Sequence, residues 1–326
     1  MIESGINTYH NHPESFTSPL RPKIQDHDPS LEIFSQTSET LSSLEPDTQD
    51  LALATLINPE FQETIFPNGK QDPTLSPDDL FQFRKGTSLL KGDFFEYFAY
   101  TYQRTIIDPE QEIVSPQHTG DVYKKGEMRD YFKDKHEKDP NAKHAEMDML
   151  VLEKRGERTQ IIGGCEVTVE KSLRKKKKKQ LTHMCQGEAY EDLITQHEPE
   201  WRVELGEIFN GHYPDLPKKI TFNPEEFNTF LILPEKNNPE EKNEKGLSDF
   251  NGVVIRAPIT RNEITELVKA LKNDLDYASG ILTNREVREL LDSLSDIVRE
   301  KDEEEDTSDI APSKFLQSQI SDIAAD

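Results

Sequence analysis

Two carboxylates near the middle of the chain fall where strands are expected. Asp148 lies in AEMDMLVLEK, and Glu166 lies in TQIIGGCEVTV, whose β-branched residues are typical of a buried strand. The RGER segment between them predicts a turn, so the two strands should form a hairpin in which acidic faces meet. Like charges that close repel unless a cation lies between them. A divalent ion would remove this repulsion, whereas the ordinary alternative is that both acids are solvated.

Six consecutive basic residues, Arg174 to Lys179, follow the Glu166 strand. At 100° per residue, a helix over about residues 173–195 places polar side chains on one narrow face. These are Lys175, Lys179, His183, Gln186 and Tyr190. A helix that packs on a core would carry apolar residues there, so this face indicates a site. The basic run itself has three interpretations: a solvated helix start, a strip that follows phosphates, or a nuclear-localisation segment.

Four short motifs follow one another in a fixed order. They are Gly92-Asp-Phe-Phe-Glu96 on a predicted helix, Glu146-Met-Asp148 and Glu166-Val-Thr168 on two strands, and Gln186-Gly-Glu-Ala-Tyr190 on a second helix. This order resembles the PD-(D/E)xK nuclease superfamily, in particular its RecB-like branch with a GxxxE helix and a QxxxY helix. The resemblance covers about residues 86–195.

The resemblance implies an α/β fold with a restriction-endonuclease-like core, in which helices flank a central mixed sheet. It also implies a Mg²⁺- or Mn²⁺-dependent nuclease that hydrolyses phosphodiester bonds, in DNA rather than RNA. Asp148 and Glu166 would be the principal metal ligands, with the Val167 carbonyl as a third, and Glu96 would reach the metal. Gln186 and Tyr190, together with Arg174, would bind substrate.

One position departs from the family pattern. Thr168 stands where the third motif of the family ends in a catalytic lysine. Lys175 or Lys179 could supply that ammonium group from the following helix. Two other functions stay open: a catalytically inactive nucleic-acid-binding module on the same fold, or an acidic protein that contacts basic partners through its tails.

Composition divides the chain into three parts. Of its 326 residues 33% are hydrophobic, and the net charge is -24. Residues 1–80 hold 14 acidic against 3 basic side chains, so residues 1–75 are predicted to be a mostly disordered acidic leader with a short helix near Leu51 to Leu56. Residues 76–280 are predicted to form the nuclease-like domain, and residues 281–326 a helix and an acidic tail. Residues 121–180 reverse the charge balance, with 17 basic against 12 acidic residues.

The remaining signals concern neighbouring elements and location. We expect a helix over residues 88–104, a loop over 107–143, strands near 228–235 and 251–258, and capping boxes at Thr260 and Thr283. No apolar run approaches the roughly 18 residues that span a bilayer, and the N-terminus lacks the features of a signal peptide. The sequence therefore predicts an intracellular protein, cytoplasmic or nuclear, without a membrane partner.

Overall fold

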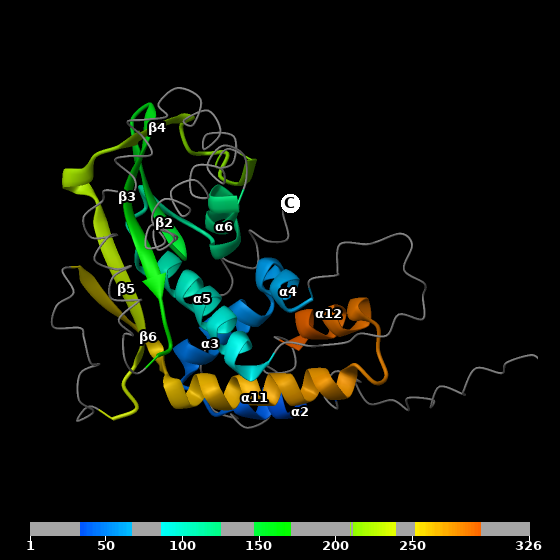
Figure 1. Cartoon of the computed structure of the whole chain (residues 1–326). Helices are drawn as coiled ribbons and strands as arrows, with labels where there is room; N and C mark the ends of the chain where they lie inside the picture. Colours follow the sequence, from blue (N-terminus) through cyan, green and yellow to red (C-terminus); the bar gives the residue numbers. More distant parts are fainter. Residues whose placement is uncertain are drawn as a thin grey trace, which may run out of the picture.

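The computed structural model describes residues 33–66, 86–124, 147–170, 209, 211–238 and 252–294. Helices in these ranges are α2 (Ser35–Ser42), α3 (Pro46–Leu56), α4 (Pro59–Ile65), α5 (Thr87–Ile106), α6 (Pro116–Lys124), α11 (Arg261–Ala278) and α12 (Asn284–Asp292), with one 3₁₀ turn, η2 (Pro224–Glu226). The strands are β1 (Gln111–Val114), β2 (Met149–Arg155), β3 (Arg158–Val167), β4 (Lys219–Phe222), β5 (Asn228–Glu235) and β6 (Val253–Thr260). The fold is mixed α/β (Figure 1).

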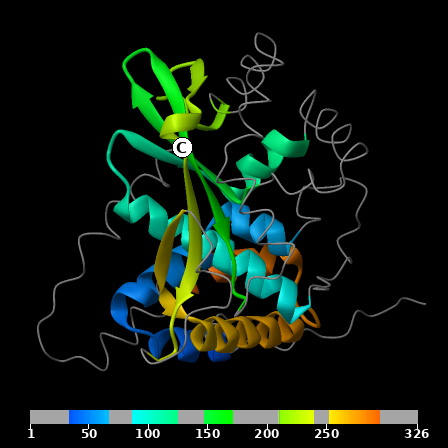
Figure 2. The ribbon, with the colours of Figure 1, turned by 60° about the vertical axis from the view of Figure 1, so that its left-hand side comes forward.

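A single mixed sheet carries all the described strands, in the order β1-β2-β3-β5-β6. The β1, β2 and β3 strands run antiparallel, whereas β5 and β6 continue the sheet in parallel with β3. The long β3 strand has two parallel neighbours in succession, β4 along residues 158–161 and β5 along residues 163–167. Figure 2 shows these strands rising together from the helical layer. The sheet is therefore a hairpin unit joined to a parallel unit through β3.

The predicted hairpin is confirmed. Arg155 pairs with Arg158, so β2 and β3 are joined by a two-residue turn. Gly156 has a φ of 62°, a left-handed conformation that glycine adopts without the steric cost of a side chain. The alternating apolar pattern on either side and this glycine are sufficient to specify the turn.

The large apolar cluster lies on one face of the sheet. In Figure 1, helices α3, α5 and α11 all lie on the same side of the strands. Cys165 and Val167 of β3 belong to the cluster that also holds Phe94 of α5 and Leu267 of α11. Because successive strand residues point to opposite faces, Glu166 projects from the face away from these helices.

Several predicted elements are confirmed within small shifts of their ends. The helix expected over residues 88–104 is α5, and the two later strands are β5 and β6. Complete capping boxes open α11 at Thr260 and α12 at Thr283. Two elements, β1 and α6, occupy a stretch expected to be a loop, because their four and nine residues are too short to give a clear periodicity.

Residues 33–66 of the predicted leader are helical rather than disordered, and the short helix expected near Leu51 to Leu56 is the end of α3. These residues form α2, α3 and α4, and their buried side chains include Phe34, Phe61 and Phe66. Asp274 of α11 accepts hydrogen bonds from the backbone nitrogen of Thr37 (2.8 Å) and from its hydroxyl (2.7 Å). The leader helices therefore acquire their burial and one of their caps from distant parts of the chain.

The helix predicted after residue 281 is α12, and it packs on the rest of the described structure. Val287 and Leu291 of α12 are fully buried and belong to the same apolar cluster as α5. No helix within the described ranges is both long and apolar enough to cross a membrane.

Candidate functional site

Asp148 is held at the open end of the β2–β3 hairpin, directly beside Glu166. The backbone nitrogen of Val167 donates to Oδ2 of Asp148 at 2.6 Å, and the nitrogen of Asp148 donates to the carbonyl of Cys165 at 3.0 Å. The Asp148 carboxylate therefore lies at the peptide bond that immediately follows Glu166. The residues of the two predicted metal ligands are therefore neighbours at this end of the hairpin.

Glu166 is completely buried on the face of the sheet away from α5. Its partner across the parallel ladder is Leu231 of β5, and the preceding pair on the same face, two residues earlier, is Gly164 with Thr229. Partners in a parallel ladder share a face, so Thr229 lies on the same face as Glu166. Burying a carboxylate is costly unless a proton, a cation or hydrogen bonds compensate it.

Met147 fixes the approach of the chain to Asp148. Its side chain is 2% exposed and lies over Gly164, where an added Cβ would come 1.6 Å from the Met147 sulfur. Only a residue without a side chain leaves room for this contact. The Gly163-Gly164 pair in β3 thus allows a methionine to anchor the residue next to Asp148.

Cys165, the residue before Glu166, carries a buried free thiol at this end of the hairpin. Burial raises the pKa of its thiol far above the ordinary value, and the nearby charge of Asp148 raises this pKa further. The thiol is therefore protonated, and it belongs to the apolar cluster on the helical face. Cys165 is a structural neighbour of the acidic pair and is not a nucleophile.

Glu96 lies on α5, which packs on the opposite face of the sheet from the Glu166 side chain. The charge of Glu96 acts on its neighbour Tyr97, whose pKa is raised by burial and by the charges of Glu60, Glu96 and Asp93. Among the residues that the structure describes, no three His, Cys, Asp or Glu side chains form a group that could hold a metal ion. The described residues therefore offer Asp148 and Glu166 as a pair, without Glu96.

Two carboxylates suit a particular class of metal. Hard divalent cations such as Mg²⁺ prefer oxygen ligands, and Mg²⁺ commonly takes only one or two protein carboxylates. Carboxylate and carbonyl oxygens equally suit Mn²⁺. Two carboxylates are thus the ligand type that the predicted ion prefers.

Thr168 takes part in the turn by which the chain leaves β3. Its nitrogen donates to the carbonyl of Ile232 at 3.1 Å, and its hydroxyl accepts from the nitrogen of Glu170 at 3.3 Å. Arg261, which is 7% exposed, donates to the carbonyls of Val169 (3.1 Å) and Glu170 (3.3 Å). The strand exit is therefore fixed by hydrogen bonds to β5 and to the start of α11.

The other predicted site residues fall outside the described ranges. They are Arg174, Lys175, Lys179, Gln186 and Tyr190. The lysine that would replace Thr168, and the residues that would bind substrate, therefore stay predictions from the sequence.

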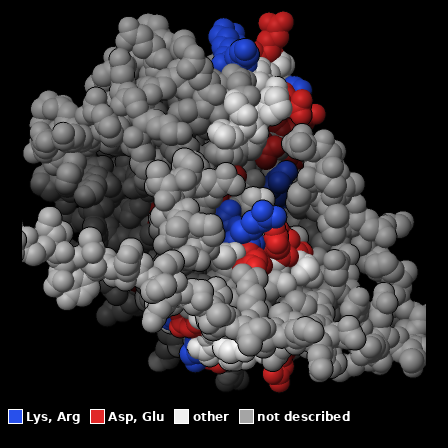
Figure 3. Space-filling view, turned by 90° about the vertical axis from the view of Figure 1, so that its right-hand side faces the viewer, with Lys and Arg blue, Asp and Glu red and all other residues white. Residues whose placement is uncertain are grey.

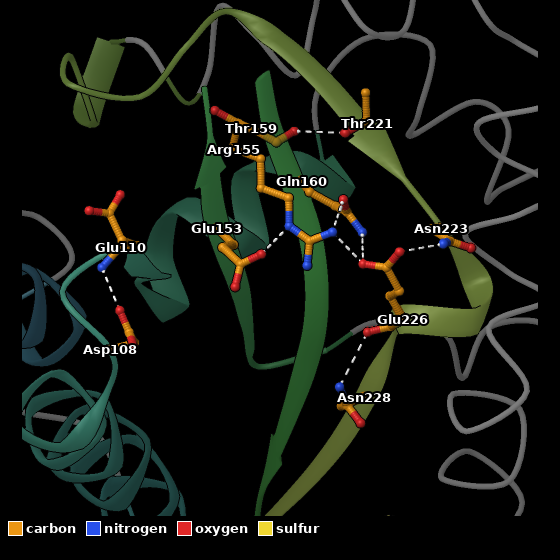
Figure 4. A network of polar contacts seen from close by, with 10 residues as sticks. All are labelled: Asp108, Glu110, Glu153, Arg155, Thr159, Gln160, Thr221, Asn223, Glu226 and Asn228. Carbon is orange, nitrogen blue, oxygen red and sulfur yellow. Dashed lines mark hydrogen bonds and ion pairs between the residues drawn. The ribbon is translucent and has the colours of Figure 1, made fainter. Parts of the chain in front are cut away.

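The closed end of the same hairpin carries a second polar network (Figure 4). Arg155 contacts Glu153 and Glu226, and it donates to Oε1 of Gln160 at 2.8 Å. The Gln160 amide in turn donates to Glu226 at 3.0 Å. The Arg155 and Glu226 side chains are each 43% exposed, so this network is a surface contact between the hairpin and η2.

Another polar cluster joins α6 to residues 211–213. The nitrogen of Ser115 donates to the Tyr213 hydroxyl at 2.9 Å, and Nδ1 of His118 lies 3.1 Å from that oxygen. The His118 ring stacks on His212 with 3.5 Å between ring centroids. Burial raises the pKa of Tyr213, so its phenol stays protonated. No pattern in the sequence predicts this cluster, which connects elements about 95 residues apart.

The described surface has no single sign of charge on the face shown in Figure 3. Lys and Arg side chains there lie next to Asp and Glu side chains. Ion pairs such as Lys272–Asp276 (2.6 Å) and Arg285–Glu289 (2.7 Å) are typical of this mixing on α11 and α12. The described part of this face therefore shows no basic groove.

Comparisons with protein-family models, with curated proteins and with solved structures found no match to this chain. What the chain does is therefore argued from its own residues.

Proposed function

We propose that this protein is a metal-dependent nuclease that hydrolyses phosphodiester bonds in DNA, with Asp148 and Glu166 as its metal ligands. The observation that carries the proposal is the 2.6 Å hydrogen bond from the Val167 nitrogen to Asp148 Oδ2. It holds one carboxylate at the peptide next to a completely buried second carboxylate. Two acids in such a place are explained by a shared divalent cation.

The order of the elements supports the same proposal. The three motifs that lie in or next to the described elements fall on α5, at the start of β2 and at the end of β3, in the order in which the resemblance requires them. A strand parallel to β3 follows, as β5. We propose on this basis that α5, the hairpin and β5 form a restriction-endonuclease-like core.

The reaction is the attack of water on phosphorus, in which one P–O ester bond breaks as the new P–O bond forms and the leaving oxygen takes a proton. A bound divalent ion would lower the pKa of water and offset the charge that develops on the phosphate. The chain's own contribution is to hold the oxygens that bind this ion. Val167 orients Asp148 through its N–H, and the pairing of Glu166 with Leu231 of β5 fixes the backbone of Glu166.

The test is cleavage of supercoiled plasmid DNA with Mg²⁺ or Mn²⁺, and with EDTA as the metal-free control. Asp148→Asn and Glu166→Gln keep the size of each side chain, and each should reduce cleavage at least about 100-fold. Glu153→Gln is the matched control, because Glu153 lies on the same hairpin at its closed end. Full cleavage by the Glu166→Gln protein, or none by the wild type, would contradict the proposal.

One observation favours a second candidate, a nucleic-acid-binding module without catalysis. Thr168 occupies the family's lysine position, and its hydroxyl is engaged in the turn to Glu170. In this case the protein would bind DNA at low salt without cleaving it, and the Asp148 and Glu166 variants would bind equally well. A filter-binding titration across salt concentrations alongside the cleavage assay distinguishes the two candidates.

A further inference from the structure

A buried hydroxyl shares the face of Glu166. Thr229 of β5 is 4% exposed, and among the residues that the structure describes its Oγ1 has no hydrogen-bond partner. A buried hydroxyl without a partner destabilises a fold, so its presence calls for an acceptor. The sequence contains a weak signal for it, since Thr229 stands at an inward position of the otherwise apolar segment NTFLILP.

The register of the sheet sets the relation between Thr229 and Glu166. Thr229 pairs with Gly164, and Glu166 lies two residues further along the same face. A rise of about 3.3 Å per residue and a strand spacing of about 4.8 Å place the two Cα atoms about 8 Å apart. Gly164 has no side chain, and the Met147 side chain lies over it on this face. Thr229 and Glu166 are therefore near neighbours on one face of two adjacent strands.

We propose that Thr229 is a positioning residue for Glu166. Its hydroxyl donates to one buried water, and this water donates to the Glu166 carboxylate and fixes its orientation toward the metal. Buried waters are held by two to four polar partners in this way. The inference rests on the proposed function, because Glu166 must be a metal ligand for its orientation to matter.

Substituting Thr229 by valine tests this role, because valine has the same shape and lacks the hydroxyl. If the hydroxyl only lacks a partner, Thr229→Val should raise stability and leave metal affinity unchanged. If it positions Glu166, Thr229→Val should weaken Mn²⁺ binding and cleavage each about 10-fold, as for other residues that orient metal ligands. Thr229→Ser, which keeps the hydroxyl, should restore both.

Thr159→Val is the matched control, since Thr159 is a fully buried threonine of β3 whose hydroxyl donates to the Pro217 carbonyl at 2.7 Å. It should lower the urea midpoint and leave Mn²⁺ affinity unchanged. Mn²⁺ affinity is measured by titration followed by electron paramagnetic resonance on the full-length chain. Wild-type affinity and cleavage in Thr229→Val would overturn the inference and leave the proposed function standing. A wild-type protein that neither binds Mn²⁺ nor cleaves DNA would overturn both.

Discussion

The two ends of the β2–β3 hairpin use carboxylates in different ways. At the closed end, Glu226 contacts Arg155 across a surface where both side chains are 43% exposed. At the open end, Glu166 is completely buried, and Asp148 is held by a backbone N–H. Surface ion pairs contribute little to stability, whereas a buried carboxylate must be matched by its surroundings. The closed end therefore connects elements, and the open end is where we propose the metal site.

The largest difference in stability between the two ends should come from substituting one glycine at each end by alanine. Gly164→Ala would place a Cβ 1.6 Å from the Met147 sulfur, so the buried Met147 side chain must move. We expect a loss of about 3 kcal/mol in the free energy of unfolding, measured with urea. Gly156→Ala at the turn meets no atom within 4 Å and should cost about 1 kcal/mol, from its φ of 62° alone. Equal losses would mean that Met147 repacks freely, and the open end would then not be rigid.

The next effect concerns the bond that holds Asp148. Asp148→Ala removes the acceptor of the Val167 N–H, and we expect a loss of about 2 kcal/mol in unfolding free energy. Asp148→Asn keeps an oxygen at this position and should retain most of the stability. The two variants separate the structural role of this side chain from metal binding, which both should lose. A stable Asp148→Ala protein would argue against the N–H bond as the anchor.

At alkaline pH the free energy of unfolding should depend on pH through the Cys165 thiol at the open end. The pKa of Cys165 is raised by burial, so above pH 9.0 the unfolded chain loses this proton while the native chain keeps it. The native state then binds more protons, and the unfolding free energy should fall by about 1.4 kcal/mol per pH unit from this group. Cys165→Ala should show a shallower slope between pH 9 and pH 10.5. Equal slopes would contradict the burial of the thiol.

The smallest effect should come from the closed end. Glu226→Gln removes the charge that faces Arg155 but leaves both side chains in water. We expect an unfolding midpoint close to that of the wild type, together with unchanged cleavage and Mn²⁺ binding. A large loss would show that the surface network stabilises the hairpin, and it would weaken the contrast between the two ends.

The parts of the fold that local patterns specify were predictable. The hairpin follows from alternation and a glycine turn, and the α11 and α12 starts follow from capping boxes. The leader helices were not predictable, because Asp274 caps α2 from 237 residues away and distant helices supply the burial. The position of Asp148 next to the peptide that follows Glu166 was expected from the hairpin. The separation of Glu96 from Glu166 was not expected from the sequence, because it depends on which face of the sheet α5 covers.

The central claim is that Asp148 and Glu166 form one metal site. Mn²⁺ titration of the wild type, Asp148→Asn, Glu166→Gln and the double variant, followed by electron paramagnetic resonance, tests it most directly. We predict one tight site in the wild type, and that the double variant loses no more affinity than either single variant, because the two ligands act as a unit. Wild-type Mn²⁺ affinity in Glu166→Gln would contradict the account.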